Sequence, residues 1–380
     1  MEEASVSIRL NPFKGCAGPE GTPVPWSRHG RILDGRPSFT LDPLFHAGCY
    51  YVQDSSAMYV GHIFRRLMSD PAVGAGLRVL DLCAAPGGKT TDIAASCREL
   101  LGDDFLLVSN EVMKARASVL CDNVAVWGDP RVAVTSVDPA AFACLEGGFD
   151  VIVADVPCSG EGMFRKDPRA LKEWSPETVK LCAARQKRIL ADVWPALKEG
   201  GVLIYSTCTY EDEENDSNLE WAAAELGGEI FPVQDEYAGY GVEMTRCGNL
   251  LKAGTVPGEG QWVGALRKTS PQRQCRGFDL SRLRPLRGEG VRKGENKGRD
   301  FIPDPDYALS LAYRPGDYPS VELDHQTALR YLHRDTLVLE GAAPGYNVVT
   351  YGGHPLGFVK NIGSRCNNLL PKGRRILMNV

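Results

Sequence analysis

The stretch DLCAAPGGK, residues 81–89, constrains the fold of this chain more than any other part of its sequence. Residues 78–82 are mainly apolar and predict a short buried strand that ends in an acid. Two adjacent glycines follow, and residues 90–96 have the pattern of a helix start. A strand, a tight glycine turn and a helix form the first unit of a doubly wound α/β domain, which binds its ligand beyond the carboxyl end of the strand.

The glycine turn is suited to ligand binding but does not match the common nucleotide loops. Glycine lets the backbone approach a ligand closely, and the helix N-terminus offers unpaired N–H groups to a carboxylate. The spacings G-x-x-x-x-G-K-[ST] and G-x-G-x-x-G are both absent from residues 81–91. An ordinary strand-to-helix turn remains the alternative for a bare pair of glycines.

Strand and helix patterns alternate through the middle of the chain. A helix from residue 55 or 56 to about residue 68 comes first. The expected elements after it are strand 78–82, helix 90–99, strand 106–110, helix 114–127, strand 132–136, strand 151–154, helix 176–197, stopped by Gly200 and Gly201, and strand 202–205. Strands separated by helical segments predict a mainly parallel, helix-covered sheet, so the fold class is α/β.

The two ends of the chain differ from this centre. The first 40 residues are rich in Pro and Gly, carry one edge-strand pattern and are too few for a core of their own. Alternation around Gly352-Gly353 predicts a hairpin in a small β-rich C-terminal module. The expected organisation is a short N-terminal segment over 1–40, the α/β domain over 41–268 with hairpins at its sheet edge, a linker over 269–299 and the β-rich module over 300–380.

Composition limits the class of protein and its environment. A chain of 380 residues with 43% hydrophobic and 24% charged residues is typical of a soluble globular protein of two or three domains. No apolar run approaches the length of a membrane span. The twelve cysteines are scattered without a C-x-x-C pair, which predicts neither a zinc site nor a disulfide framework. Reduced thiols and a cytoplasmic location are therefore expected.

Positive charge gathers in the last third of the chain although the net charge is −5. Residues 267–299 hold eleven Lys or Arg against three acids. After Glu340 there is no acid, and the basic residues there are Lys360, Arg365, Lys372, Arg374 and Arg375. This distribution indicates a polyanion partner bound by part of the surface, and a merely solvated linker is the alternative.

Two cysteines follow predicted strands at the ligand edge of the sheet. Cys158 comes three residues after the strand that ends at Asp155, within DVPCSGEG, and Cys208 follows strand 202–205 within STCT. A free cysteine is usually a small buried hydrophobe. Two of them at the carboxyl ends of strands in one sheet form a more specific signal, because thiols placed there reach the ligand.

These three motifs together resemble the Sun/Fmu-like RNA (cytosine-5) methyltransferases. The matching segments are D-x-C-A-A-P-G-G-K from Asp81, D-x-P-C-S-G-x-G from Asp155, and S-T-C-T from Ser206. Residues 155–168 and the C-terminal module are most similar to the RsmF-type branch, whose substrate is small-subunit ribosomal RNA. The resemblance implies a Rossmann-like S-adenosylmethionine-dependent methyltransferase domain followed by a PUA-like module. Val156 stands where the family usually has Ala, and family members usually carry a longer N-terminal region, so residues 1–40 are expected to be a truncated segment.

The resemblance also assigns roles to residues. Cytosine C5 is a poor nucleophile, so such an enzyme first adds a thiolate to C6 and methylates the activated C5. Cys208 is the implied nucleophile, Cys158 assists release of the product, and Asp155 hydrogen-bonds the flipped base. The implied S-adenosylmethionine site comprises Cys83, Ala84, Ala85, Pro86, Gly87, Gly88, Lys89, Glu111, Asp138 and Asp155.

The expected function is methyl transfer from S-adenosylmethionine to C5 of an RNA cytosine, in small-subunit ribosomal RNA, through a covalent adduct between cysteine and C6. Transfer RNA or another RNA is an alternative substrate, and a non-catalytic RNA-binding assembly factor is an alternative function. A DNA methyltransferase would use Cys158 as its nucleophile and would leave Cys208 and the basic module unexplained. The expected partner is RNA, with no membrane and no metal, and the protein is expected to act as a monomer.

Overall fold

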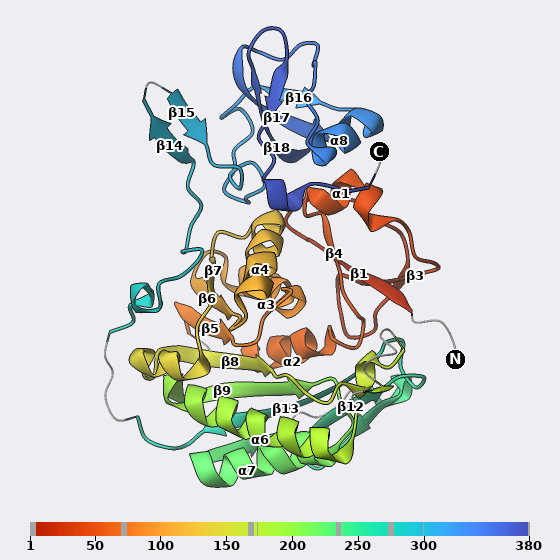
Figure 1. Ribbon diagram of the computed structural model, residues 1–380. Helices are drawn as coiled ribbons and strands as arrows, with labels where there is room; N and C mark the ends of the chain where they lie inside the picture. The colour runs from red at the N-terminus through yellow and green to blue at the C-terminus, as the bar shows by residue number, and fades with distance from the viewer. Residues whose placement is uncertain are drawn as a thin grey trace.

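The computed structural model describes residues 5–69, 74–165, 171–172, 174–232, 237–272, 277–298 and 300–378. In this part of the chain a large central sheet lies between two groups of helices, and smaller sheets lie to one side and at one end (Figure 1). None of the helices so described is both long and apolar enough for a membrane crossing.

The central sheet carries the doubly wound topology predicted from the sequence. Its parallel strands are β5 (Leu77–Asp81), β6 (Phe105–Asn110), β7 (Val132–Thr135), β8 (Phe149–Asp155) and β9 (Leu197–Thr207). The antiparallel part consists of β10 (Gly228–Phe231), β11 (Val242–Met244), β12 (Gly248–Lys252) and β13 (Gly260–Lys268). The strand order is β11-β12-β13-β9-β8-β5-β6-β7, and β10 pairs with β13 outside this path. Because β5, β8 and β9 are parallel neighbours, their carboxyl ends lie at one edge.

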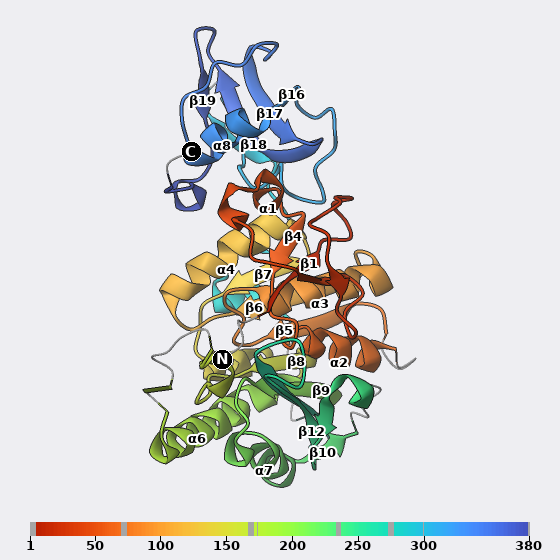
Figure 2. The same ribbon diagram turned by 90° about the vertical axis from the view of Figure 1, so that its right-hand side faces the viewer.

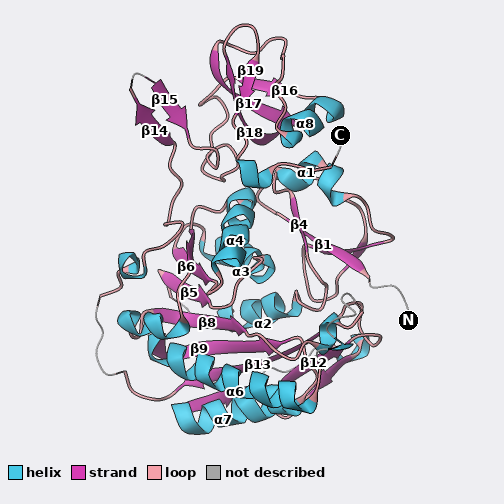
Figure 3. Ribbon diagram, viewed as in Figure 1, coloured by secondary structure: helices cyan, strands magenta, loops and turns pink. Residues whose placement is uncertain are grey.

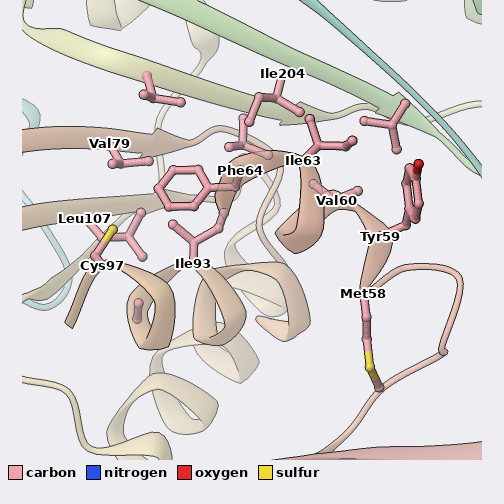
Figure 4. Packing of buried hydrophobic residues seen from close by; sticks show 14 of the residues in the cluster. Met58, Tyr59, Val60, Ile63, Phe64, Val79, Ile93, Cys97, Leu107 and Ile204 are labelled. Carbon is pink, nitrogen blue, oxygen red and sulfur yellow. The ribbon is translucent and has the colours of Figure 1, made fainter. Parts of the chain in front are cut away.

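Helices cover both faces of this sheet (Figures 1 and 3). One face packs against α2 (Tyr59–Met68), α3 (Gly88–Leu101) and α4 (Lys114–Trp127), and the other against α6 (Pro176–Val193) and α7 (Asp216–Leu226). On the first face, Phe64 and Ile93 lie against Val79, Leu107 and Ile204 of the strands (Figure 4). Successive strand residues point to opposite faces, so Val79 and Leu80 belong to different cores.

The predicted helices and strands of this domain are found, with one difference in the first helix and two after residue 176. Helix α2 begins at Tyr59 rather than at residue 55 or 56, because residues 55–58 form turns before it. Helix α6 ends at Val193 rather than near residue 197, because Pro195 in the following η4 turn (Trp194–Ala196) has no N–H to continue the helix. Gly200 and Gly201 lie inside β9, where Gly200 has a φ of +78°. They therefore belong to the start of the strand rather than to the end of the helix.

The N-terminal residues form a four-stranded antiparallel sheet of their own. It contains β1 (Val6–Leu10), β2 (Thr22–Pro23), β3 (Gly30–Leu33) and β4 (Tyr50–Val52) in the order β2-β3-β1-β4, with α1 (Pro43–His46) before β4. The boundary expected at residue 40 falls between two strands of this sheet.

The expectation that all cysteines are reduced thiols is wrong for Cys16 and Cys49. These residues form a disulfide with a Cα–Cα distance of 5.6 Å. The pairing of β1 with β4 places the chain after Leu10 beside the chain before Tyr50, which brings the two cysteines together. Their separation of 33 residues has no short-range motif, so the sequence pattern did not indicate the bond.

The C-terminal residues form the expected β-rich module (Figure 2). A sheet in the order β16-β17-β18-β19 contains β16 (Ser320–Glu322), β17 (Gly345–Tyr351), β18 (His354–Asn361) and β19 (Cys366–Asn368), with α8 (His325–His333) beside it. The expected linker is partly structured: its strand β14 (Gly294–Lys297) pairs with β15 (Asp300–Pro303), which lies just beyond the expected boundary, and Arg287 forms a bridge with Val134 of β7.

The C-terminal module packs directly on the rest of the molecule. One hydrophobic core contains Ile8, Cys49 and Tyr50 from the N-terminal sheet together with Leu329 and Leu356 from the module. The Arg374 guanidinium also bonds Asp122 of α4 at 2.8 Å and Asp306 at 2.7 Å. Shared apolar burial and these ion pairs fix the module on the N-terminal sheet and α4.

Candidate active site

The ends of β8 and β9 bring the two motif cysteines into contact. Asp155 and Ser206 are register partners, so the loops that follow these strands begin side by side. Cys158 lies in the first loop and Cys208 in the second, and their Sγ atoms are 3.2 Å apart. Two sulfur atoms at this distance share one hydrogen bond, in which one thiol donates to the other sulfur.

The two cysteines differ in pKa, and this difference favours the proton on Cys158. The hydrogen bond from Cys158, followed by the positive charge of Lys89, lowers the pKa of Cys208 against the opposing effects of burial and Asp155. The hydrogen bond to Cys208 and burial raise the pKa of Cys158 well above its usual value. Cys208 is therefore the more acidic thiol of the pair, and Cys158 holds its proton more strongly and is the better donor in their hydrogen bond.

Lys89 connects the glycine loop to this pair. Its Nζ lies 2.9 Å from Oδ2 of Asp155. Burial alone would lower the pKa of Lys89, but Asp155 and the Cys208 sulfur outweigh burial and raise it. The other oxygen of Asp155 accepts hydrogen bonds from Ser206 Oγ at 2.7 Å and from Gln261 Nε2 at 3.1 Å. The ammonium and the carboxylate are thus held as a pair beside Cys208.

A buried carboxylate holds the loop that carries Cys158. Glu214 is fully buried, and burial raises its pKa. It accepts a hydrogen bond from the Ser159 backbone N–H at 3.1 Å and another from Gln186 Nε2 at 2.7 Å. The same Gln186 amide donates to the carbonyl oxygen of Pro157 at 3.0 Å. Both residues that flank Cys158 are therefore tied to Glu214 and Gln186.

The two cysteine loops are also tied to each other. Glu161 accepts hydrogen bonds from Thr209 Oγ1 at 2.9 Å and from the Tyr210 N–H at 2.7 Å. The Gly162 N–H donates to the Cys208 carbonyl at 2.7 Å. A Cβ at position 162 would lie 2.9 Å from that oxygen, so only glycine allows this approach.

The glycine loop between β5 and α3 is held by backbone contacts from several sides. Gly87 has a φ of +116°, which favours glycine. Asn123 donates to the Pro86 carbonyl at 2.7 Å, and Arg116 donates to the Ala85 carbonyl at 2.8 Å. Arg9 from β1 donates to the Gly88 carbonyl at 3.2 Å. These contacts use loop carbonyls as acceptors and leave the helix N-terminus facing the strand ends.

Acids lie at the ends of three neighbouring strands. Asp81 is fully buried, burial raises its pKa to about 7, and its Oδ1 has no hydrogen-bond partner in the described chain. Glu111 is buried after β6, where it accepts from the Met113 N–H at 2.9 Å and pairs with Arg116 at 3.2 Å. Asp138 is exposed after β7 and caps the η2 turn (Pro139–Leu145) by accepting from the Ala140 N–H. An unpartnered oxygen on Asp81 fits a ligand that donates hydrogen bonds at this edge.

Comparison with known proteins identifies the family to which these domains belong. Residues 72–226 match the model of 16S rRNA methyltransferase RsmB/F, residues 1–55 that of the RsmF N-terminal domain, and residues 318–376 that of the RsmF PUA domain. The chain is 31% identical to ribosomal RNA small subunit methyltransferase F of Klebsiella pneumoniae, over 97% of this chain and 88% of that protein. The protein of the same name from Escherichia coli O157:H7 is 30% identical over 96% and 89%. The chain belongs to the RsmF family.

A solved structure agrees with this placement. A methyltransferase homologue from Pyrococcus horikoshii is 26% identical, with a TM-score of 0.57 over 70% of this chain and 87% of that one. The central domain of this RsmF-family chain is thus a Rossmann-like methyltransferase domain that uses S-adenosylmethionine, and the C-terminal module is a PUA domain.

Several residues that build the RsmF-family site were not indicated by the sequence. Glu214 stands within the acidic run of residues 211–216, which includes the η5 turn before α7, but its burial against Ser159 is visible only in the fold. Gln186 and Gln261 are ordinary helix and strand residues by pattern. Asn110 joins two strand ends by donating to the Leu82 and Val137 carbonyls at 3.2 and 3.0 Å. Of the basic residues after Cys158, Arg165 pairs with Glu259 at 2.9 Å, and Lys166 lies outside the described residues.

Proposed function

We propose that this chain methylates C5 of a cytosine in small-subunit ribosomal RNA, using Cys208 as the nucleophile. The observation that carries the proposal is the pair of sulfur atoms 3.2 Å apart, in which Cys208 has the lowered pKa and Cys158 the raised one. A thiolate is the form of cysteine that adds to an electrophilic carbon such as C6. The family to which the chain belongs acts on ribosomal RNA, which supports this substrate.

The first step is attack by the Cys208 sulfur on C6 of a flipped cytosine. Charge that develops on the ring during addition falls beside the Lys89–Asp155 pair, whose atoms are 2.9 Å apart. The Asp155 carboxylate accepts a hydrogen bond from the edge of the base, and the Lys89 ammonium stabilises the negative charge that develops on the ring. Such donors and acceptors contribute most when they are fixed before the reaction, as the hydrogen bonds to Ser206 and Gln261 fix Asp155.

S-adenosylmethionine supplies the methyl group when it is bound at the glycine loop. We propose that the backbone of residues 83–88, from Cys83 through Ala84, Ala85, Pro86 and Gly87 to Gly88, holds its amino-acid end near Asp81. Glu111 is positioned to accept from the ribose hydroxyls, as acids at this strand end do in dinucleotide folds. Asp138 serves the adenine side in addition to its role as a cap.

Release of the product requires loss of the C5 proton, which we assign to Cys158. Bond formation at Cys208 removes the negative charge that held the proton on Cys158. The pKa of Cys158 then falls, so this thiol can release its proton to solvent and, as the thiolate, accept the proton that leaves C5. Elimination of the Cys208 sulfur from C6 follows and restores the aromatic ring.

The test compares single cysteine variants with RNA and S-adenosylmethionine. Cys158→Ala is expected to accumulate a protein–RNA conjugate that survives denaturing electrophoresis, because attack proceeds and release does not. Cys208→Ala is expected to give neither conjugate nor 5-methylcytosine, and Cys144→Ala serves as a matched control outside the pair. A conjugate in Cys208→Ala and none in Cys158→Ala would reverse both roles.

The RNA substrate, the oligomeric state and the cellular location are also part of the proposal. We propose that the protein acts as a monomer in the cytoplasm and prefers small-subunit ribosomal RNA to transfer RNA. Parallel reactions with 16S ribosomal RNA, assembled small subunits and transfer RNA, each read out as 5-methylcytosine by mass spectrometry, decide this. Equal methylation of transfer RNA would contradict the proposed preference.

A further inference from the structure

Three metal-binding side chains from distant parts of the chain meet where the N-terminal sheet joins the PUA domain. Cys16 lies in the loop after β1, Cys49 directly precedes β4, and His354 is the first residue of β18. Their potential ligand atoms all lie within 4.8 Å of one another. In Figures 1 and 2 this region corresponds to the contact between α1 and the C-terminal module.

Contacts other than the sulfur–sulfur bond hold Cys49 and His354 in place. Cys49 is fully buried in the core that the two domains share, and its carbonyl accepts from the Asn11 N–H at 2.8 Å. His354 follows the Gly352-Gly353 turn, whose N–H groups donate to the Glu322 carboxylate at 2.5 and 3.3 Å. Packing and this anchored turn therefore position Cys49 and His354 independently of the bond between the two sulfur atoms.

The His354 imidazole has no hydrogen bond to the described chain. The other histidines of the same junction differ in this respect. His46 pairs with the Thr40 carbonyl at 2.9 Å, and His325 pairs with the Leu41 carbonyl at 3.2 Å. His354 therefore has its ring nitrogens available for a ligand beside the two sulfur atoms.

We propose that Cys16, Cys49 and His354 form a zinc site when the two cysteines are reduced. Two thiolates and an imidazole are a donor set that Zn²⁺ prefers, with bonds of about 2.3 Å to sulfur and about 2.0–2.1 Å to nitrogen. Tetrahedral geometry with such bonds places these three donors about 3.6–3.8 Å apart, which the cluster within 4.8 Å accommodates. Water fills the fourth position.

The disulfide and the zinc complex are alternative states of one cluster. A dithiol reductant breaks the Cys16–Cys49 bond, transfers two electrons to it and becomes a disulfide itself, leaving two thiols. Zn²⁺ then displaces one proton from each thiol. Each state connects the N-terminal loop to β4, but only the zinc complex includes His354 and so ties the PUA domain to the N-terminal sheet.

This connection reaches the cofactor loop through one short strand. Cys49 precedes β4, and Gln53 directly follows it. The Gln53 side chain accepts from Arg9 Nε at 2.9 Å, and Arg9 donates to the Gly88 carbonyl at 3.2 Å. Zinc at the junction therefore stabilises the element that supports the S-adenosylmethionine loop.

The test uses full-length protein in a Cys158→Ser/Cys208→Ser background, so that the active-site sulfur atoms bind no metal. The protein is reduced with dithiothreitol, freed of reductant without air, and titrated with Zn²⁺ against a chromophoric chelator. One Zn²⁺ per chain is expected, and His354→Ala is expected to weaken binding at least about tenfold. Co²⁺ in place of Zn²⁺ should give thiolate-to-metal charge-transfer absorption that is lost in Cys16→Ser.

Matched controls separate this site from other thiols and histidines. Cys144→Ser and His325→Asn remove a free cysteine and a second junction histidine, and both should leave the Zn²⁺ affinity unchanged. Reduced protein that binds no Zn²⁺ would overturn the proposal and leave a structural disulfide. Binding that His354→Ala does not weaken would overturn it equally, and neither result depends on the methyltransferase activity.

Discussion

At the scale of single residues, Cys158 and Cys208 carry the same side chain but differ in acidity. The hydrogen bond between them is the largest cause, since it lowers the pKa of Cys208 and raises that of Cys158; Lys89 adds to the first effect and Glu214 to the second. A shared proton at a sulfur–sulfur distance of 3.2 Å makes each thiol the main influence on the other. A change at one cysteine must therefore appear in the titration of the other.

Replacing Cys158 by Ala is expected to shift the pH profile of Cys208 alkylation upward. Alkylation needs the thiolate, which exists above the pKa, and Cys158→Ala removes the largest cause that lowers this pKa. The measurement is the rate of iodoacetamide labelling of Cys208, read by mass spectrometry from about pH 6 to pH 10 without RNA. Cys144→Ala should keep the wild-type midpoint, and an unshifted Cys158→Ala profile would show that the two sulfur atoms do not share a proton.

Glu214 gives a second prediction, since it holds the Cys158 loop without facing the base. Glu214→Gln should slow turnover about 10–100-fold, equivalent to about 1–3 kcal/mol, because the neutral amide weakens the bonds that Ser159 and Gln186 donate to Oε2. Its NH2 group would also replace Oε1, which accepts from the Ser159 N–H at 3.3 Å. Its neighbour Glu213 is exposed, so Glu213→Gln is the matched control. Single-turnover methylation and conjugate release are measured separately, together with S-adenosylmethionine affinity, which should not change. Equal rates for the two variants would remove Glu214 from the positioning role.

The sequence indicated the candidate cysteines better than the residues that hold them. Asp155, Cys158 and Cys208 lie at or just after strand ends, and Lys89 lies at the start of α3. Such positions are local properties that a short motif reveals. Glu214 and Gln186 became partners of the Cys158 loop only through the packing of α6 and the η5 turn (Asp212–Glu214). Their role depends on burial and on tertiary contacts, which an acidic run or a helix pattern does not show.

At the scale of elements, local pattern was sufficient for the central sheet and insufficient for the N-terminal one. Helix α4 has the predicted bounds, and β5, β6 and β8 differ from prediction by one or two residues. Strands β2, β3 and β4 contain two, four and three residues, too few for a periodic signal. They form a sheet because β1 pairs with strands more than 20 residues away, and such non-local pairing is not encoded in any short window.

Strand β1 supports the cofactor loop through Arg9, which is almost fully buried. Arg9→Met should weaken S-adenosylmethionine binding by about 1–2 kcal/mol, because the Gly88 carbonyl and the Thr91 hydroxyl lose their common donor. Isothermal titration calorimetry checks the prediction below the unfolding temperature of each variant. Arg31 on β3 bonds only local backbone carbonyls, at positions 28 and 30, so Arg31→Met should keep the wild-type affinity. An unchanged affinity in Arg9→Met would separate the N-terminal sheet from cofactor binding.

At the scale of the whole molecule, the PUA domain is a packed part of the enzyme rather than a tethered module. Its core includes Ile8, Cys49 and Tyr50 of the N-terminal sheet, so removal of residues 269–380 would expose apolar surface as well as remove charge. Two of the five basic residues after Glu340 are also engaged internally. Lys360 pairs with Asp300 at 2.6 Å, and Arg374 pairs with Asp122 and Asp306.

Three of the five basic residues after Glu340 are exposed and have no ion pair within the described chain, namely Arg365, Lys372 and Arg375. Replacing all three by Gln should weaken RNA binding and reduce the slope of log affinity against log salt by about 2–3, since each phosphate contact contributes about 0.7–0.9. Fluorescence anisotropy with labelled ribosomal RNA at several salt concentrations measures this slope.

The matched control replaces Lys180, Arg185 and Arg188 by Gln. These residues are exposed on α6, at the opposite end of the molecule from the PUA domain (Figure 1). Both triple variants lose the same charge, so a general loss of attraction for a polyanion would lower their slopes equally. A larger loss for the C-terminal variant is expected, because direct phosphate contacts release counterions and distant charges do not. Equal slopes in the two variants would place the RNA-binding surface elsewhere on the molecule.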